Sequence, residues 1–147
     1  MKPTASEWLV RLAGWCLGGV FVYAGVLKVT DPWAFADSVA SFRLLPAVLI
    51  NPVALILPVL EIILGVALIA GVKRSVGAGM LGVLCVLFAA ALGQALVRGI
   101  EVDCGCFGGG APSTARTVWA LLRDIGLGLL AWWVWHRGRR AANEPVA

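Results

Sequence analysis

The sequence predicts an all-α membrane protein, a bundle of four transmembrane helices with a short amphipathic interfacial helix between helices 1 and 2. Of its 147 residues, 61% are hydrophobic and only 14% are charged. In soluble domains nearly half of the residues are apolar and about a quarter are charged. The apolar residues fall into four runs, each long enough or nearly long enough to cross a bilayer. We expect spans over about 8–30, 47–71, 75–98 and 115–136, within a single membrane domain of residues 1–147.

The first span has the shortest uncharged run. Residues 12–27 lie between Arg11 and Lys28, whose long side chains can extend towards the interfaces and lengthen the span. A cleaved signal peptide is the alternative, but the run reaches Lys28 without a small-x-small cleavage site. We therefore expect a retained first helix.

Asp31 and Pro32 predict the start of a short helix, because aspartate is a good N-cap and proline fits the first helical position. The segment to Arg43 is expected to lie on the outer membrane surface. Its apolar face should comprise Trp33, Ala36, Val39 and Ala40, opposite Asp37, Ser38 and Ser41.

Small residues recur at helical spacing in the first and third spans, which in lipid allows close helix approach. We expect Pro52 and Pro58 to kink the second span, Ser113 or Thr114 to cap the fourth, and this last helix to end at His136. The two small-residue faces are Gly14, Gly18, Phe21 and Gly25, and Gly79, Gly82, Ala89 and Gly93.

The distribution of basic residues predicts cytoplasmic termini, by the positive-inside rule. This orientation places the segment between the third and fourth spans outside the cytoplasm, and it explains the pI near 9.2 without nucleic-acid binding. The inner side receives Lys2, Arg11, Lys73, Arg74, Arg137, Arg139 and Arg140, and the outer side Lys28, Arg43, Arg98, Arg116 and Arg123.

Four charges lie within or at the edge of spans, where each is costly. Lys28, Glu61, Arg123 and Asp124 should all lie in the outer half of the bundle, with Arg123 about 100° around the helix from Asp124. Two hypotheses stay open. The charges form an ion network that fixes helix order, or one of the acids exchanges protons with nearby thiols or a bound quinone.

The motif VDCGCFGG, residues 102–109, places Cys104 and Cys106 on the outer side. A metal site is disfavoured because zinc needs four ligands, and Cys16 and Cys85 are interpreted as small buried apolar residues on the inner side. A structural disulfide between Cys104 and Cys106 would close almost no loop and add little stability. A strained, exposed disulfide is typical of labile or catalytic pairs, so these two cysteines are the candidate catalytic residues.

The whole chain resembles the MauE/DoxX-type family of redox-associated membrane proteins, within which the methylamine utilisation (MauE) group is most similar. The resemblance covers roughly residues 10–135 and is carried by YAGVLKVTDPWAFADSVASFRLLP (23–46), LPVLEIILG (57–65), VDCGCFG (102–108) and the Arg123-Asp124 pair.

The resemblance implies an inner-membrane protein that supports maturation or export of the disulfide-rich small subunit of methylamine dehydrogenase. It implies a thioredoxin-like, MauD-like extracytoplasmic partner. Cys104 and Cys106 would be the redox pair, with Lys28, Glu61, Arg123 and Asp124 as supporting positions. The chain has no CxxC motif and no second external cysteine pair, so electrons must pass to a partner or to a quinone.

The function expected first is thus a membrane thiol–disulfide redox component, possessing thiol–disulfide oxidoreductase activity if the CxC pair reacts. The alternative is a non-enzymatic assembly factor or anchor, which docks a partner near Trp33 and Phe42. A small transporter is disfavoured, because the sequence has no matching inverted halves. Substrate protein, direction of electron flow and oligomeric state stay open, and a quinone is the one cofactor the sequence suggests.

Overall fold

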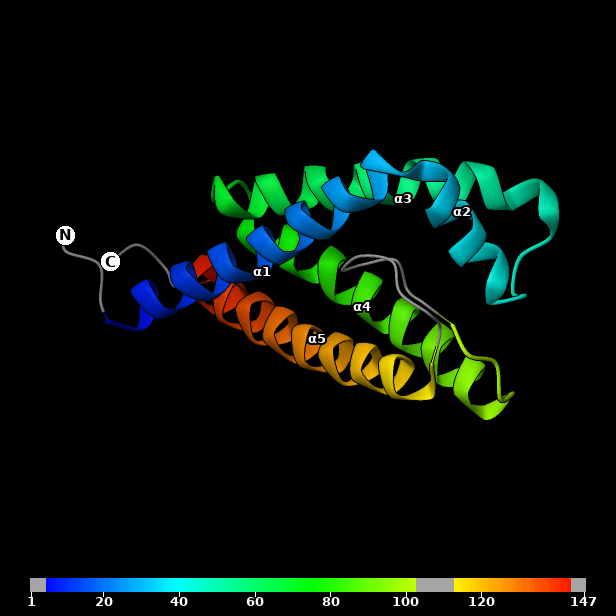
Figure 1. Ribbon diagram of the computed structural model, residues 1–147. Helices are drawn as coiled ribbons and strands as arrows, with labels where there is room; N and C mark the ends of the chain where they lie inside the picture. Colours follow the sequence, from blue (N-terminus) through cyan, green and yellow to red (C-terminus); the bar gives the residue numbers. More distant parts are fainter. Residues whose placement is uncertain (1–4, 103–112, 144–147) are drawn as a thin grey trace.

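The computed structural model describes residues 5–102 and 113–143, most of which are helical (Figure 1). Four helices are long and apolar enough to cross a membrane over Ser6–Thr30, Ala47–Ile69, Arg74–Val97 and Thr114–Arg140. The predicted fold is therefore confirmed. The helices are α1 (Ala5–Thr30), α2 (Pro32–Ser41), α3 (Ala47–Ile69), α4 (Arg74–Val97) and α5 (Thr114–Asn143).

The short helix α2 begins as the sequence predicts and packs against α3. The Asp31 carboxylate accepts a hydrogen bond from the Ala34 amide at 3.0 Å, with proline at the first helical turn. The apolar side chain that packs inwards is Phe35, 4% exposed, whereas Trp33 is 78% exposed. Phe35 and Ala36 pack against Ala54 of α3. Ala36 and Val39 of the expected apolar face belong to this cluster and Trp33 does not; the placement of that face on the membrane surface stays a prediction.

Helix α5 continues to Asn143, beyond the predicted end at His136. The basic residues that suggested a tail stack on aromatic side chains one turn earlier. The Arg137 guanidinium lies 5.6 Å from the Trp133 ring centroid, and that of Arg139 lies 4.9 Å from the Trp135 ring centroid. Such cation–π contacts stabilise a charged last turn.

Helices α1 and α3 form one tightly packed pair, and the glycine face predicted for α1 makes this contact. A Cβ added at Gly18 would lie 2.6 Å from the Gly65 carbonyl oxygen, and one at Gly25 would lie 2.8 Å from the Pro58 carbonyl oxygen. Both distances are too short for any side chain. Close backbone approach is how small residues hold helices together in lipid. Helix α3 continues through both Pro52 and Pro58.

Helices α4 and α5 form the second pair. A Cβ added at Gly79 would lie 3.1 Å from the Trp135 ring, and one at Gly82 would lie 3.5 Å from Ala131. The expected face is wrong at Gly93, where an added Cβ would meet nothing within 4 Å.

The two helix pairs meet at one end of the molecule and diverge towards the end that carries α2 (Figure 1). At the closed end, Arg137 of α5 donates a hydrogen bond to the Ser6 hydroxyl at 3.3 Å, so the start of α1 and the end of α5 lie together. One core cluster joins all four long helices there, and it comprises Leu17, Phe21, Leu64, Leu68, Ala78, Leu81, Leu84, Cys85, Ala131 and Val134.

Candidate functional site

A buried ion pair joins α1 to α3. The Lys28 Nζ donates hydrogen bonds to both carboxylate oxygens of Glu61, at 2.7 and 2.8 Å. Both side chains are 1% exposed. The close packing at Gly25, three residues before Lys28, brings the two helices near enough for this contact. The pair neutralises two charges that would each be costly to hold within a span.

Two phenyl rings flank the same ammonium group. The Lys28 Nζ lies 5.2 Å from the ring centroid of Phe35 and 4.9 Å from that of Phe88. Both distances are within the range for cation–π attraction, which strengthens where water is excluded. Lys28 thus contacts side chains from α2, α3 and α4. Neither phenylalanine was singled out from the sequence, because both look like ordinary apolar residues of their helices.

A second ion pair lies within α5. Arg123 Nε and Nη2 both donate to Asp124 Oδ1, at 2.9 and 2.7 Å. Neighbouring residues point about 100° apart on a helix, so the arginine side chain folds back to reach the carboxylate. The sequence places Arg123 about 100° around the helix from Asp124 and leaves open which of the four charges pair; the Arg123 guanidinium joins Asp124.

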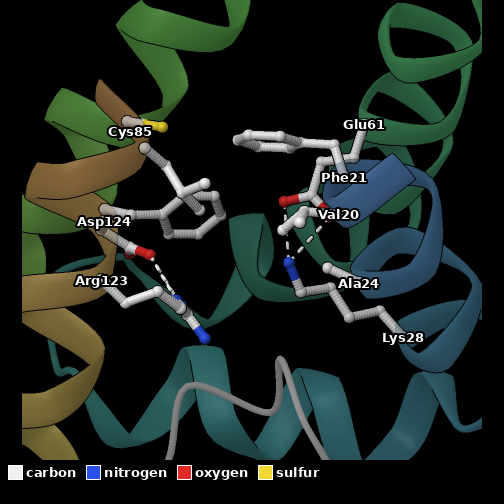
Figure 2. Close-up of a pocket in the computed structure, with 10 residues that line it drawn as sticks. Val20, Phe21, Ala24, Lys28, Glu61, Cys85, Arg123 and Asp124 are labelled. Carbon is white, nitrogen blue, oxygen red and sulfur yellow. Dashed lines mark hydrogen bonds and ion pairs between the residues drawn. The ribbon is translucent and has the colours of Figure 1, made fainter. Parts of the chain in front are cut away.

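The two ion pairs face one another across a small cavity (Figure 2). Figure 2 shows Lys28 and Glu61 on one side and Arg123 and Asp124 on the other. The cavity has a volume of about 20 Å³, which is room for about one water molecule. Its lining residues are Val20, Phe21, Ala24, Lys28, Glu61, Cys85, Phe88, Arg123, Asp124 and Leu127.

This arrangement combines donors and acceptors around a space that can hold water. The ammonium and guanidinium groups can donate hydrogen bonds, and the two carboxylates can accept them or take a proton. Asp124 lies ten residues after the first residue of α5, or about 15 Å along the helix axis. The cluster is therefore a neutral but polar centre well inside the span. It is suited to receiving or supplying protons, and its role stays a prediction.

Cys85 belongs to this centre, which the sequence analysis missed. The thiol is 2% exposed and lines the cavity beside Asp124 (Figure 2). The close approach of Gly128, whose added Cβ would lie 3.4 Å from the Cys85 Cβ, brings the two helices together at this level. Cys16 is exposed, so its predicted burial was wrong, because residue 16 lies on the outward face of α1.

The candidate redox cysteines, Cys104 and Cys106, lie outside the described residues. The described residues on either side of them are held at the open end of the bundle. Thr117 Oγ1 of α5 donates to the Val102 carbonyl oxygen at 3.1 Å, and Val102 is 1% exposed. The Glu101 carboxylate accepts hydrogen bonds from the Thr114 amide and hydroxyl, at 3.2 and 2.9 Å. The predicted cap is present as well, since the Ser113 hydroxyl accepts from the Arg116 amide at 3.4 Å.

Comparison with known protein families matches residues 6–137 to the family described as "Methylamine utilisation protein MauE". The chain belongs to the MauE family. It is 35% identical over 126 residues to the methylamine utilization protein MauE of Paracoccus denitrificans, covering 84% of this chain and 65% of that protein. It is 38% identical over 110 residues to the MauE of Methylorubrum extorquens, covering 74% of this chain and 58% of that protein.

A third MauE, from Methylophilus methylotrophus, is 34% identical over 88 residues, which cover 59% of this chain and 46% of that protein. The chain therefore spans roughly half to two thirds of the length of these relatives. No solved structure gives a significant match. Family membership thus rests on sequence, and it agrees with the resemblance carried by residues 23–46, 57–65 and 102–108.

Proposed function

We propose that this MauE-family protein is a membrane thiol–disulfide redox component that supports oxidative maturation of extracytoplasmic proteins, with Cys104 and Cys106 as the reacting pair. The observation that carries the proposal is the DCGCFG motif, residues 103–108, in the connection between α4 and α5. Val102 and Thr117 fix the two ends of this connection on the bundle.

The exchange reaction balances in electrons and protons. A thiolate of the substrate protein attacks one sulfur of the Cys104–Cys106 disulfide, which gives a mixed disulfide and a free thiolate on the other cysteine. A second substrate thiolate then attacks the mixed disulfide. The substrate leaves as a disulfide, and Cys104 and Cys106 are left as a dithiol. A carboxylate pair within the span, Glu61 and Asp124, is suited to handle the two protons involved.

The biological context follows the family. The relatives are named methylamine utilization proteins, and we place this chain in the same kind of pathway, with a thioredoxin-like, MauD-like partner outside the cytoplasm. The protein would lie in a bacterial inner membrane with both termini cytoplasmic. This orientation is supported by the basic residues gathered at the closed end, among them Arg11, Arg74 and Arg137.

The test is to trap the mixed disulfide in cells that carry the full chain. Cys104→Ser or Cys106→Ser leaves one reactive thiol, so one of the two should accumulate a covalent complex that dithiothreitol dissolves. The double serine variant should form no complex and should fail to complement a deletion strain. Cys16→Ser, which removes an exposed thiol outside the motif, is the matched control and should behave as wild type. Full complementation by the double serine variant would overturn the redox function.

A second function, a non-enzymatic anchor for a partner protein, is favoured by one observation. Trp33 on α2 is 78% exposed although α2 otherwise packs against α3. This function predicts that Trp33→Ala abolishes partner association while the cysteine variants stay active. The same complementation experiment therefore separates the two functions.

A further inference from the structure

The closed end of the bundle gathers basic side chains from three segments: the start of α1, the turn from α3 to α4 and the end of α5 (Figure 1). The end of α5 contacts both of the others. Its Arg137 donates a hydrogen bond to the Ser6 hydroxyl of α1 at 3.3 Å. The Ser75 hydroxyl, at the start of α4, donates to the Trp135 carbonyl oxygen of α5 at 3.4 Å. Among the described residues, the closed-end cations are Arg11, Lys73, Arg74, Arg137, Arg139 and Arg140.

One of these cations, Arg11, lies between two tryptophans on the same face of α1. Trp8 precedes it by three residues and Trp15 follows it by four, which are the spacings of neighbours on a helix surface. The Arg11 guanidinium lies 5.7 Å from the Trp8 ring centroid, and the Trp15 indole donates to the carbonyl oxygen of Ile69, the last residue of α3, at 3.1 Å. Arg11 lies one helical turn, about 6 Å, further towards the closed end than Trp15. It is therefore at the level of the turn from α3 to α4.

Neighbouring groups also hold three of the other arginines in place. Arg137 and Arg139 each lie beside a tryptophan ring one turn earlier in α5. In the turn from α3 to α4, the Arg74 guanidinium packs against Gly71, where an added Cβ would lie 2.8 Å from Arg74 Nη2. A side chain that is already ordered loses less conformational entropy when a ligand binds it. The closed-end cations therefore form a positive surface that is partly organised in advance.

Acidic side chains do not balance this charge in the part of the chain that the structure describes. There, the acid at the closed end is Glu7, and no ion pair joins a carboxylate to any of the closed-end cations. Exposed tryptophan rings lie within about two turns of the cations on α1 and α5, namely Trp8, Trp15 and Trp132. Tryptophan is enriched at the membrane interface, and these rings belong to spans, so lipid covers them in a membrane. The occupant that meets both the rings and the cations has a negative head and hydrocarbon chains.

We propose that the closed end binds the headgroups of anionic phospholipids, with the phosphates on the arginines and the acyl chains along α1 and α5. The planar guanidinium group matches the oxygens of a phosphate, and an arginine stacked on a ring still presents N–H groups at its edge. Clusters of basic side chains at the ends of spans bind such headgroups in other membrane proteins. Membrane orientation requires basic residues at one end of the bundle but not their stacking on tryptophan rings. The site uses neither the cysteine motif nor the buried ion pairs, so it goes beyond the proposed function.

The test measures the first lipid bound by the full chain in dodecylmaltoside micelles, by native mass spectrometry. Dioleoyl-phosphatidylglycerol and dioleoyl-phosphatidylcholine have the same chains and differ in the charge of the headgroup. We expect the wild type to bind phosphatidylglycerol more tightly by about fivefold or more, the ratio that the attraction of one cation to anionic lipid gives. Raising the ammonium acetate concentration to about 1 M should remove most of this preference, because the Debye length falls to about 3 Å.

Two double variants locate the site. Arg11→Gln with Arg74→Gln removes one cation from α1 and one from the turn from α3 to α4, and it should weaken phosphatidylglycerol binding about fivefold or more. Arg43→Gln with Arg98→Gln is the matched control, because it removes two charges from exposed positions at the open end. The length of a span, about 30 Å, exceeds the Debye length, so binding by the control should change less than about twofold.

A third variant repeats the test from α5 if the first closed-end variant fails to fold. Arg139→Gln with Arg140→Gln removes two exposed cations near the end of the helix and should reduce the preference for phosphatidylglycerol as well. Three outcomes overturn the proposal: equal binding of the two lipids by the wild type, equal losses in the closed-end and open-end variants, or displacement of phosphatidylglycerol by hexaglutamate or glycerol phosphate. The second would make the preference an effect of net charge, and the third would assign the surface to a soluble acidic segment or anion.

Discussion

Removing one partner of the Lys28–Glu61 pair should strongly destabilise the protein. The Nζ lies 2.7 Å from one carboxylate oxygen, and both side chains are 1% exposed. At that separation and an effective dielectric constant of about 20, the Coulomb attraction is about 6 kcal/mol. Breaking a buried pair from one side typically costs about 3–5 kcal/mol, because the remaining charge stays buried without its partner. We expect Glu61→Gln and Lys28→Met each to lower the free energy of unfolding by that amount.

The double variant separates the ion pair from the packing around it. Lys28→Met with Glu61→Gln removes both charges and leaves side chains of similar volume. It should therefore cost no more than the larger of the two single changes. The coupling between the two sites is then at least the smaller single effect, about 3 kcal/mol, whereas ordinary interhelical hydrogen bonds in membranes couple by only about 0.6 kcal/mol. The size of the measured coupling energy therefore shows whether Lys28 and Glu61 interact as a charge pair or as an ordinary polar contact.

The assay is unfolding in dodecylmaltoside micelles at rising SDS fraction, followed by circular dichroism. For a chain of this size, each kcal/mol corresponds to about 2–4 °C in a parallel thermal scan, so the single variants should lose at least about 6 °C. Asp37→Asn is the matched acid-to-amide control at an exposed position of α2 and should stay within about 0.5 kcal/mol. Single effects that add within about 0.5 kcal/mol would refute the reasoning, since additivity indicates independent sites.

Two further predictions concern packing and the connection between α4 and α5. Gly18→Leu should force α1 away from α3, because an added Cβ would already lie 2.6 Å from the Gly65 carbonyl oxygen; overpacking of this kind costs about 1–3 kcal/mol or more. Gly19→Leu, where a Cβ would meet nothing within 4 Å, should be near neutral in the same micelle assay, and equal losses would contradict the packing. Thr117→Val removes the hydrogen bond to the Val102 carbonyl oxygen and should cost about 1–3 kcal/mol, since a buried acceptor is left unsatisfied; a thermal midpoint unchanged within about 1 °C would count against this anchor.

The helices could be predicted because lipid restricts what a span can be. A span must be long enough to cross the bilayer and must form all of its backbone hydrogen bonds within itself, which determines the four long helices. The N-cap at Asp31 determines where α2 starts. The contact of α2 with α3 could not be predicted, because an apolar face alone does not show that Phe35 rather than Trp33 packs against α3. The end of α5 was misjudged for a similar reason, since Arg137 and Arg139 find aromatic partners within the helix.

The candidate site was predictable in its charged members and not in its walls. A charge within a span is rare enough that each of the four could be singled out. Phe88 and Cys85 look like any other apolar residues of a span, so only the packing of α4 against its neighbours shows that they line the cavity. The pairing was also not evident from position. Helical geometry turns neighbouring residues apart, and only the flexible arginine side chain brings the Arg123 guanidinium to Asp124.

The pairing observed bears on why these charges are present. The Lys28–Glu61 bond connects α1 to α3, so holding two helices in register is a sufficient reason for it. The Arg123–Asp124 bond lies within α5, and these two side chains form the wall of the cavity that faces Lys28 and Glu61. A single charge within a span is costly. Gathering two cations and two carboxylates around one small space compensates each of the four charges, which is a physical reason for all of them to lie at the same level of the bundle.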